Sequence, residues 1–203
     1  YTSVGACDLS GALSGTTTLA PTACYPYVLR GNLTVPVGAT LRMAPGTVVK
    51  ASYSSYEILV RGRLEAQGTA DQKVLLTSLQ DNAPGQWVGV RMDGGTAILD
   101  YTELRHAGTA IYLLPSTTNA VTVTNSFIHD NSGYPVDLPN VWQLPSIHLA
   151  NTTFANHANP YIIVGGGTLA GDMSLYPPPP GLLGYLMNSS WTVPVGATLR
   201  MAP

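Results

Sequence analysis

Short runs of alternating apolar and polar residues cover most of the chain. The runs are rich in Val, Ile, Leu and Thr, and Gly or Pro interrupts nearly every longer window. Apolar residues keep the spacing of an amphipathic helix for no more than about two turns anywhere. The pattern therefore predicts an all-β chain with strands at 33–37, 47–51, 57–66, 73–79, 87–92, 97–104, 110–114, 120–128 and 146–154.

Apolar positions recur at a regular interval in the middle of the chain. Segments that begin at Leu99, Val123 and Leu149 align with one another. A sandwich or barrel gives no reason for this interval, whereas a coil does, because each inward side chain contacts its equivalent about 4.8 Å away in the next turn. The sequence predicts a solenoid, a parallel β-helix with turns of about 24 residues. Equivalent core positions are Leu104, Ile128 and Phe154, and then Ile111, Val136 and Ile162.

A second, longer repeat involves the stretch TVPVGATLRMAP. It runs from Thr34 to Pro45 and recurs letter for letter from Thr192 to Pro203, an offset of 158 residues. At about 24 residues a turn, such a unit holds between six and seven turns. We expect this stretch to be a turn on which further copies of the module can stack.

The resemblance between the two copies extends upstream of the identical stretch. GALSGTTTL from Gly11 resembles GTLAGDMSL from Gly167, an offset of 156 residues. The two extra residues fall around YPPPPG at 176–181, which is stiff and cannot pair in a sheet. We predict a β-helix module with an N-terminal lead-in segment at 1–165, and the start of a second copy at 166–203, with the seam near 176–181.

Three stretches carry a resemblance to a known class of protein. YVLRGNLTVPVGATLRMAPGTVVK (27–50), ILVRGRLEAQGTADQKVLLTS (58–78) and WVGVRM (87–92) are followed by turns with a small Asn motif. This order resembles the bacterial secreted right-handed parallel β-helix repeat proteins of the pectin-lyase-like class, in particular their non-catalytic surface members. The resemblance implies a right-handed coil but no activity, because the fold serves lyases, hydrolases, adhesins and passive surface modules.

The composition excludes several partners. Only 10% of residues are charged, the net charge is −2, and Lys50 and Lys73 are the only lysines. This gives no basic surface for nucleic acid or for an anionic membrane. No apolar run approaches the roughly 20 residues of a membrane helix, so we expect no membrane insertion. Nothing at Tyr1 resembles a cleavable leader, which leaves open whether Tyr1 is a mature N-terminus.

Two cysteines, Cys7 and Cys24, lie close together in a Gly-, Ser- and Thr-rich segment. A disulfide that closes this short loop suits an oxidising environment, so we expect an extracellular or cell-surface location. The alternative is a pair of free buried thiols.

Tyrosine and tryptophan greatly outnumber phenylalanine, with 11 Tyr and 3 Trp against 2 Phe. Their apolar rings with a polar group suit sugar stacking and protein interfaces. The candidate ligand-binding residues are Tyr53 and Tyr56, joined by Tyr25 and Tyr27. The alternative is a set of half-buried rings that cover the end of the coil.

Acidic residues give little support for an enzyme. The densest group is Asp93, Asp100, Glu103 and Asp130, and its spacing does not place three carboxylates on equivalent positions of adjacent turns. A calcium-dependent lyase needs such a cluster with a basic residue beside it. The paired Asp-Asp, Gly-His-Gly and Arg-Ile-Lys signatures of pectate lyases and polygalacturonases are missing. We therefore predict no enzyme activity and no cofactor.

One pair of residues suggests a weak metal site. His106 and Asp130 occupy equivalent positions in neighbouring turns, so an imidazole is expected to stack on a carboxylate. Such a pair can bind Zn²⁺ or Cu²⁺, but it provides too few ligands and fits a polar ladder at a turn equally well.

Together these features predict an extracellular structural or adhesive module that forms a stalk, fibre or surface layer. Its partners are further copies of itself, end to end, joined covalently in tandem or by non-covalent stacking. The alternative is a β-helix that binds or cleaves a polysaccharide, with glycans as partners.

Overall fold

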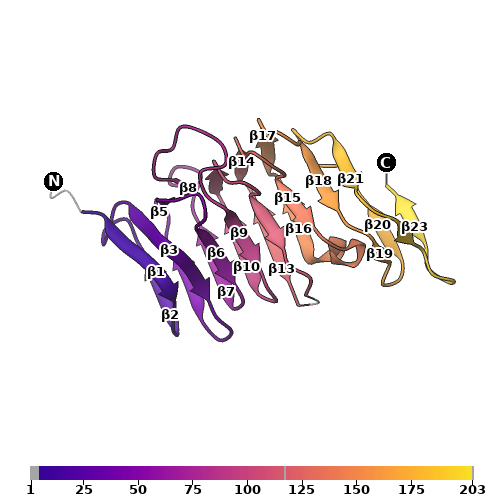
Figure 1. Ribbon diagram of the computed structural model, residues 1–203, viewed down its shortest axis with the longest axis horizontal. Helices are drawn as coiled ribbons and strands as arrows, with labels where there is room; N and C mark the ends of the chain where they lie inside the picture. Colours follow the sequence, from indigo (N-terminus) through magenta and orange to yellow (C-terminus); the bar gives the residue numbers. More distant parts are fainter. Residues whose placement is uncertain (1–4, 117, 203) are drawn as a thin grey trace.

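A computed structural model describes residues 5–116 and 118–202 of the chain. Nearly all of its regular structure is parallel β, and the strands stack side by side from the N-terminal to the C-terminal end of an elongated body (Figure 1). The predicted right-handed parallel β-helix is confirmed.

Three faces form the wall of the coil. The first face holds β2 (Thr16–Leu19), β4 (Thr40–Met43), β7 (Arg63–Gln67), β10 (Thr96–Asp100), β13 (Ala120–Thr124) and β16 (Ile147–Ala150). The second holds β5 (Val48–Ala51), β8 (Val74–Ser78), β11 (Thr102–Arg105), β14 (Phe127–His129) and β17 (Thr153–Ala155). The third holds β6 (Glu57–Val60), β9 (Gly89–Met92), β12 (Ile111–Leu113), β15 (Val136–Leu138), β18 (Tyr161–Val164) and β21 (Gly184–Met187).

The remaining elements lie at the two ends of the coil. The long strand β3 (Tyr27–Val35) pairs with β5 through its first half and with β6 through its second, so it joins the second and third faces. At the N-terminal end, β1 (Cys7–Ala12) pairs with β3. Towards the C-terminal end, β19 (Gly167–Thr168) pairs with β22 (Trp191–Thr192), and β20 (Met173–Leu175) pairs with β23 (Leu199–Met201). A short 3₁₀ helix η1 (Val141–Ser146) lies between β15 and β16.

The register of the strands confirms the predicted stacking. Leu99 lies beside Val123, and Val123 lies beside Leu149, as the alignment of the three segments predicts. The predicted core positions stack in the same way, with Leu104 on Ile128 and Ile128 on Phe154. These three core residues are buried, and they belong to one continuous apolar core along the coil.

Columns of left-handed residues shape the turns between faces. Between the first and second faces, Tyr101, Asn125 and Asn151 all have φ between 45° and 50°. Asparagine tolerates this conformation better than most residues, and the side chain of Asn151 donates a hydrogen bond to that of Asn125 at 3.4 Å. A single residue therefore suffices to turn the chain here.

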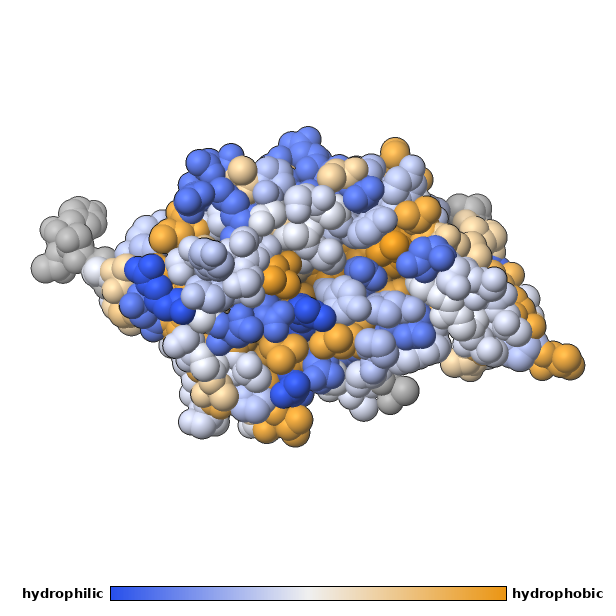
Figure 2. All heavy atoms as spheres, viewed as in Figure 1, coloured by the Kyte–Doolittle hydropathy of each residue, from blue (hydrophilic) through white to orange (hydrophobic). Residues whose placement is uncertain are grey.

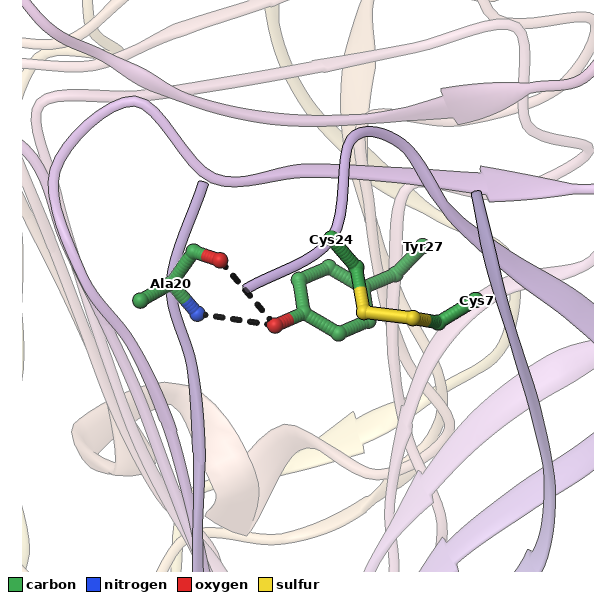
Figure 3. The surroundings of a disulfide bond; sticks show 4 residues. All are labelled: Cys7, Ala20, Cys24 and Tyr27. Carbon is green, nitrogen blue, oxygen red and sulfur yellow. Dashed lines mark hydrogen bonds between the residues drawn. A yellow bond between two sulfur atoms is a disulfide. The ribbon is translucent and has the colours of Figure 1, made fainter. Parts of the chain in front are cut away.

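The predicted disulfide joins Cys7 and Cys24 at the N-terminal end. The ring of Tyr27 lies beside it, and the Tyr27 hydroxyl donates to the carbonyl of Ala20 and accepts from its amide, both at 3.0 Å (Figure 3). The lead-in segment is thereby fixed to the first turn of the coil.

The two turns within the second copy of the repeated sequence pair with each other in the same register as the two turns within the first copy. We call residues 11–45 the first copy and residues 167–202 the second. Thr17 lies beside Leu41 in the first copy, and Met173 lies beside Leu199 in the second, which are the equivalent positions. Corresponding backbone hydrogen bonds have matching lengths. The Leu13 amide donates to the Thr34 carbonyl at 2.9 Å, and the Leu169 amide donates to the Thr192 carbonyl at 2.9 Å. Likewise, the Ala44 amide donates to Leu19 at 2.9 Å and the Ala202 amide to Leu175 at 2.8 Å.

Strand β21 of the second copy lies one face further around the coil axis than its equivalent in the first copy. Tyr27 lies on the second face, where it pairs with Val49. Its equivalent, Tyr185, pairs with Ile162 of β18, at the end of the third face. Between Tyr27 and its equivalent Tyr185, the chain thus completes six turns of the coil and advances by one additional face. No strand forms at 176–181, where the next strand of the second face would be expected. Instead, the Pro180 carbonyl accepts one hydrogen bond from the Phe154 amide at 3.0 Å.

The proposed division into modules at 1–165 and 166–203 stays a prediction. Residues 176–181 connect β20 to β21 without strand structure. Pro203, the last residue of the repeated stretch, and Tyr1 lie outside the described residues.

Met43 and Met201 provide a matched test of how the two copies are covered. Met43 is buried, whereas Met201 is 72% exposed. Met43→Ala is expected to lower the free energy of unfolding by about 2–5 kcal/mol, because it leaves a cavity. Met201→Ala is expected to change it by less than about 0.5 kcal/mol. Chemical denaturation measures both, and equal costs would contradict the open C-terminal end.

Candidate functional site

A lateral groove of about 630 Å³ lies where the third face meets the loops that lead into it. Outward side chains of adjacent strands line it, because Arg91, Tyr112 and Asp137 are neighbours across β9, β12 and β15. The loop before β9 and the turns before β12 and β15 supply the other wall with Trp87, Val88, Gly108, Thr109 and Tyr134.

The electrostatics of this groove are unusual for such a weakly charged protein. The Arg91 guanidinium lies 4.8 Å from the centre of the Tyr112 ring, and its Nη1 is 3.6 Å from Glu57. The Nε of Arg91 is buried and has no hydrogen-bond partner among the described residues. Burial raises the pKa of Asp137. The groove thus combines an aromatic surface, a cation and a carboxyl group, which suits polar ligands such as sugars.

Two of the four predicted tyrosines are close in sequence to Ser54, which lines this groove. The rings of Tyr53 and Tyr56 are 5.8 Å apart, and Ser54, between them in sequence, lines the groove. The carbonyl of Tyr56 accepts a hydrogen bond of 2.9 Å from the amide of Val88, which also lines it.

The other two predicted tyrosines do not join them. Tyr27 is 5% exposed and packs in the core, so its ring presents no face to a ligand. Tyr25 is exposed at the N-terminal end, where its amide bonds to Gly5. Tyr112 and Tyr134 line the groove, and the ring pair of Tyr53 and Tyr56 flanks Ser54, which also lines it.

A polar network centred on Asp81 covers the second face. Asp81 accepts hydrogen bonds from Arg105 at 2.7 and 2.9 Å and from Thr77 at 2.5 Å, and Lys50 lies 3.5 Å away. Burial by itself would raise the pKa of Asp81, but the bonds from Arg105 and Thr77 outweigh it and hold the pKa well below its usual range. The network fixes the 79–88 loop against the coil, and so shapes the groove beside it.

The structure does not join His106 to Asp130 through their side chains. Their main chains do stack as predicted, because the His106 amide donates to the Asp130 carbonyl at 3.1 Å. The His106 ring instead contacts Asp81 at 3.0 Å, and the Asp130 carboxylate contacts His129 at 2.5 Å. Within the described residues no three His, Cys, Asp or Glu side chains converge as metal ligands. In the described residues, His106 and Asp130 thus take part in separate side-chain contacts, with Asp81 and with His129.

The pattern of the sequence alone did not reveal Asp81, Arg91 or Asp137. Asp81 follows the predicted strand 73–79 in an insertion, which makes the interval from Leu64 to Ala97, its neighbour on the next turn, longer than the usual one. That excess length was the available signal for the loop. Arg91 and Asp137 carried no such signal, because single charged residues in outward positions are usual in strands.

The strand order defines the chain as a parallel β-helix protein with a groove along its side. Residues 11–133, which are 123 of the 203 residues, match the model of a family described as the pectate-lyase-like beta helix domain. The chain belongs to this family. No curated protein and no solved structure matches it.

No helix in 5–116 or 118–202 is long and apolar enough to cross a membrane.

His157 gives a pH-dependent test of the buried polar ladder. Burial lowers its pKa to about 4, and its ring bonds to the Ile128 carbonyl at 3.1 Å. Between pH 6.5 and 4 the unfolded chain therefore binds a proton that the folded protein does not, so stability falls as the pH falls. As the pH falls from 6.5 to 4, we expect the free energy of unfolding of the natural protein to decrease by on the order of 2 kcal/mol more than that of the His157→Gln variant.

The measurement is urea denaturation at several pH values. The same substitution at an exposed position of strand β16, His148→Gln, serves as the control. An equal pH dependence in the natural protein and in His157→Gln would contradict the assignment.

Proposed function

We propose that the chain is a non-enzymatic structural or adhesive module of an extracellular stalk, fibre or surface layer, in which copies of the module stack end to end. The observation that supports this most strongly is the second copy, whose two successive turns pair with each other in the same register as those of the first copy. A coil in which the same pair of turns recurs can be extended by repeating the same contacts.

The one-face advance gives such an array a distinct shape. Each module would be turned by one face relative to the module before it, so three modules would restore the original orientation. The lateral grooves of successive modules would then point in three directions around the axis. An array of this kind presents its grooves in several directions around its axis, as suits a stalk or fibre.

Two further features favour a passive extracellular role. The Cys7–Cys24 disulfide suits an oxidising compartment. Most acidic side chains are held in ion pairs, such as Asp81 with Arg105, Glu65 with Arg42 and Asp93 with Arg61, and are not poised for acid–base chemistry.

The deciding measurement is the intact mass of the native polypeptide from its source, together with sedimentation of the purified chain at high concentration. We expect a native mass several times 21.3 kDa, or self-association of the 21.3 kDa chain into rods. A native mass near 21.3 kDa combined with a monomer at high concentration would contradict the proposal.

The lateral groove favours a second candidate function, binding of a polysaccharide. Tyr112→Ala removes the ring beneath the Arg91 guanidinium, and Tyr53→Ala removes an exposed ring next in sequence to Ser54, which lines the groove. If the groove binds glycans, each variant should weaken binding about tenfold, the order of magnitude of one lost aromatic contact.

The readout is binding to a broad glycan panel, followed by calorimetry with any glycan retained. Tyr176→Ala, an exposed tyrosine that does not line the groove, is the matched control. Binding of no glycan in the panel, or equal losses in Tyr176→Ala and Tyr112→Ala, would exclude this candidate.

A further inference from the structure

Among the described residues that line the lateral groove, Asp137 is the only acidic one. Its side chain is partly buried, and within the described part of the chain no hydrogen-bond donor or cation offsets this burial, which alone raises its pKa. The charged form of such a carboxyl group is costly, because burial penalises the charge and nothing nearby compensates it. A group of this kind in a cleft is a candidate for contact with a ligand.

The cation of the groove, Arg91, is already engaged by the protein. Its guanidinium lies 4.8 Å from the centre of the Tyr112 ring, and its Nη1 is 3.6 Å from the Glu57 carboxylate. Its Nε atom is buried. An anionic ligand would therefore have to compete with Glu57 for this guanidinium. Because the charges of Arg91 and Glu57 offset each other, ionised Asp137 leaves the groove with one net negative charge.

An aromatic ring separates the two charges of the groove. Tyr112 lies beside Asp137 on one neighbouring strand and beside Arg91 on the other. Adjacent strands are about 4.8 Å apart, so a ligand unit that lies against the Tyr112 ring can place a polar substituent near Asp137. Arg91 is roughly 10 Å from Asp137 along the coil axis, a distance at which salt screens much of its repulsion of a second cation.

The rest of the surface gives a charged ligand little reason to bind. The net charge of the chain is only −2, and Figure 2 shows strongly hydrophilic residues in several separate patches on the face that it presents. Selection by charge must therefore come from single groups such as Asp137. A protonated amine satisfies an unpartnered carboxylate with a charge-assisted hydrogen bond, whereas an acetamide or a hydroxyl group brings no charge and an acid is repelled.

We propose that the lateral groove binds a glycan with free amino groups, whose sugar ring lies against Tyr112 and whose protonated amine donates a hydrogen bond to the Asp137 carboxylate. The inference rests on the second candidate function, binding of a polysaccharide, and it names the class of glycan. It also implies that the groove discriminates against acidic glycans, because Glu57 already holds the guanidinium that would receive them.

The test compares two tetrasaccharides that differ only in acetylation, β-1,4-linked glucosamine and β-1,4-linked N-acetylglucosamine. Calorimetry with the full chain measures their binding at mildly acidic pH, where the amines carry protons. We expect the amino tetrasaccharide to bind at least about tenfold more tightly, the order of magnitude of one hydrogen bond between charged groups. A tetrasaccharide of glucuronic acid should bind more weakly than both.

Asp137→Asn keeps the shape of the side chain and removes its charge, so it should reduce the preference for the amino tetrasaccharide to less than about twofold. Asp71→Asn, at an exposed position outside the groove lining, is the matched control and should retain the preference. Because burial opposes the charged form of Asp137, Asp137→Asn should fold at least as stably as the natural chain, which urea denaturation checks.

A second variant tests the place of binding without altering Asp137. A Cβ atom on Gly108, which lines the groove, would lie 3.7 Å from the carbonyl oxygens of Trp87 and Val88, an ordinary contact. Gly108→Leu should therefore fold, narrow the groove and weaken the binding of both tetrasaccharides about tenfold. Unchanged binding would place the amine outside the groove and overturn the inference.

Equal binding of the two tetrasaccharides, or a preference that persists in Asp137→Asn, also overturns the inference. Equally tight binding of a lysine tetrapeptide does so too, because it would assign the groove to amines of peptides. If both tetrasaccharides bind equally and Tyr112→Ala weakens both, glycan binding stands and only the amine class is wrong. If no glycan of any kind binds, the candidate function fails together with the inference, and the proposed array is unaffected.

Discussion

Each turn of this coil depends on contact with the turns immediately before and after it. Inward side chains such as Leu104, Ile128 and Phe154 are buried because they stack on their equivalents, and the strands that carry them satisfy their backbone groups in the same direction. In a sandwich a second sheet supplies such burial, whereas in a solenoid the neighbouring turns supply much of it. The same dependence makes the ends of the coil different from its middle, because a terminal turn has a neighbour on one side only.

Turn geometry decides how freely the surface can vary around that core. Three of the turns between the first and second faces consist of a single left-handed residue, Tyr101, Asn125 or Asn151, whereas the turns at 44–47 and 68–73 are longer. Between the second and third faces the turns are longer and carry the 79–88 loop. The Asp81 network holds this loop down, and the lateral groove forms beside it. The groove is therefore built where the coil tolerates additional chain.

The break in strand structure inside the second copy follows from the chemistry of proline. The YPPPPG stretch has no amide hydrogens at its prolines and cannot serve as a second-face strand, so only Pro180 bonds to β17. The chain regains strand pairing on the third face, at β21, and this strand therefore lies one face further around the axis than its equivalent at Tyr27–Leu29. The long repeat is thus compatible with the much shorter period of the turns, because the repeat need not contain a whole number of turns.

The sequence by itself determined the class of fold, the period and the equivalence of the two copies. These features are written in apolar positions such as Leu99, Val123 and Leu149, which must recur in order to stack, and in the identical letters of the repeated stretch. Only the tertiary structure decided that Tyr27 is buried, that Arg91 and Asp137 meet Tyr112 in a groove, and that Met201 is exposed while Met43 is not. The reason is physical: an identical local sequence folds into an identical turn, but its burial and its partners depend on which other segments lie against it, and these come from distant parts of the chain.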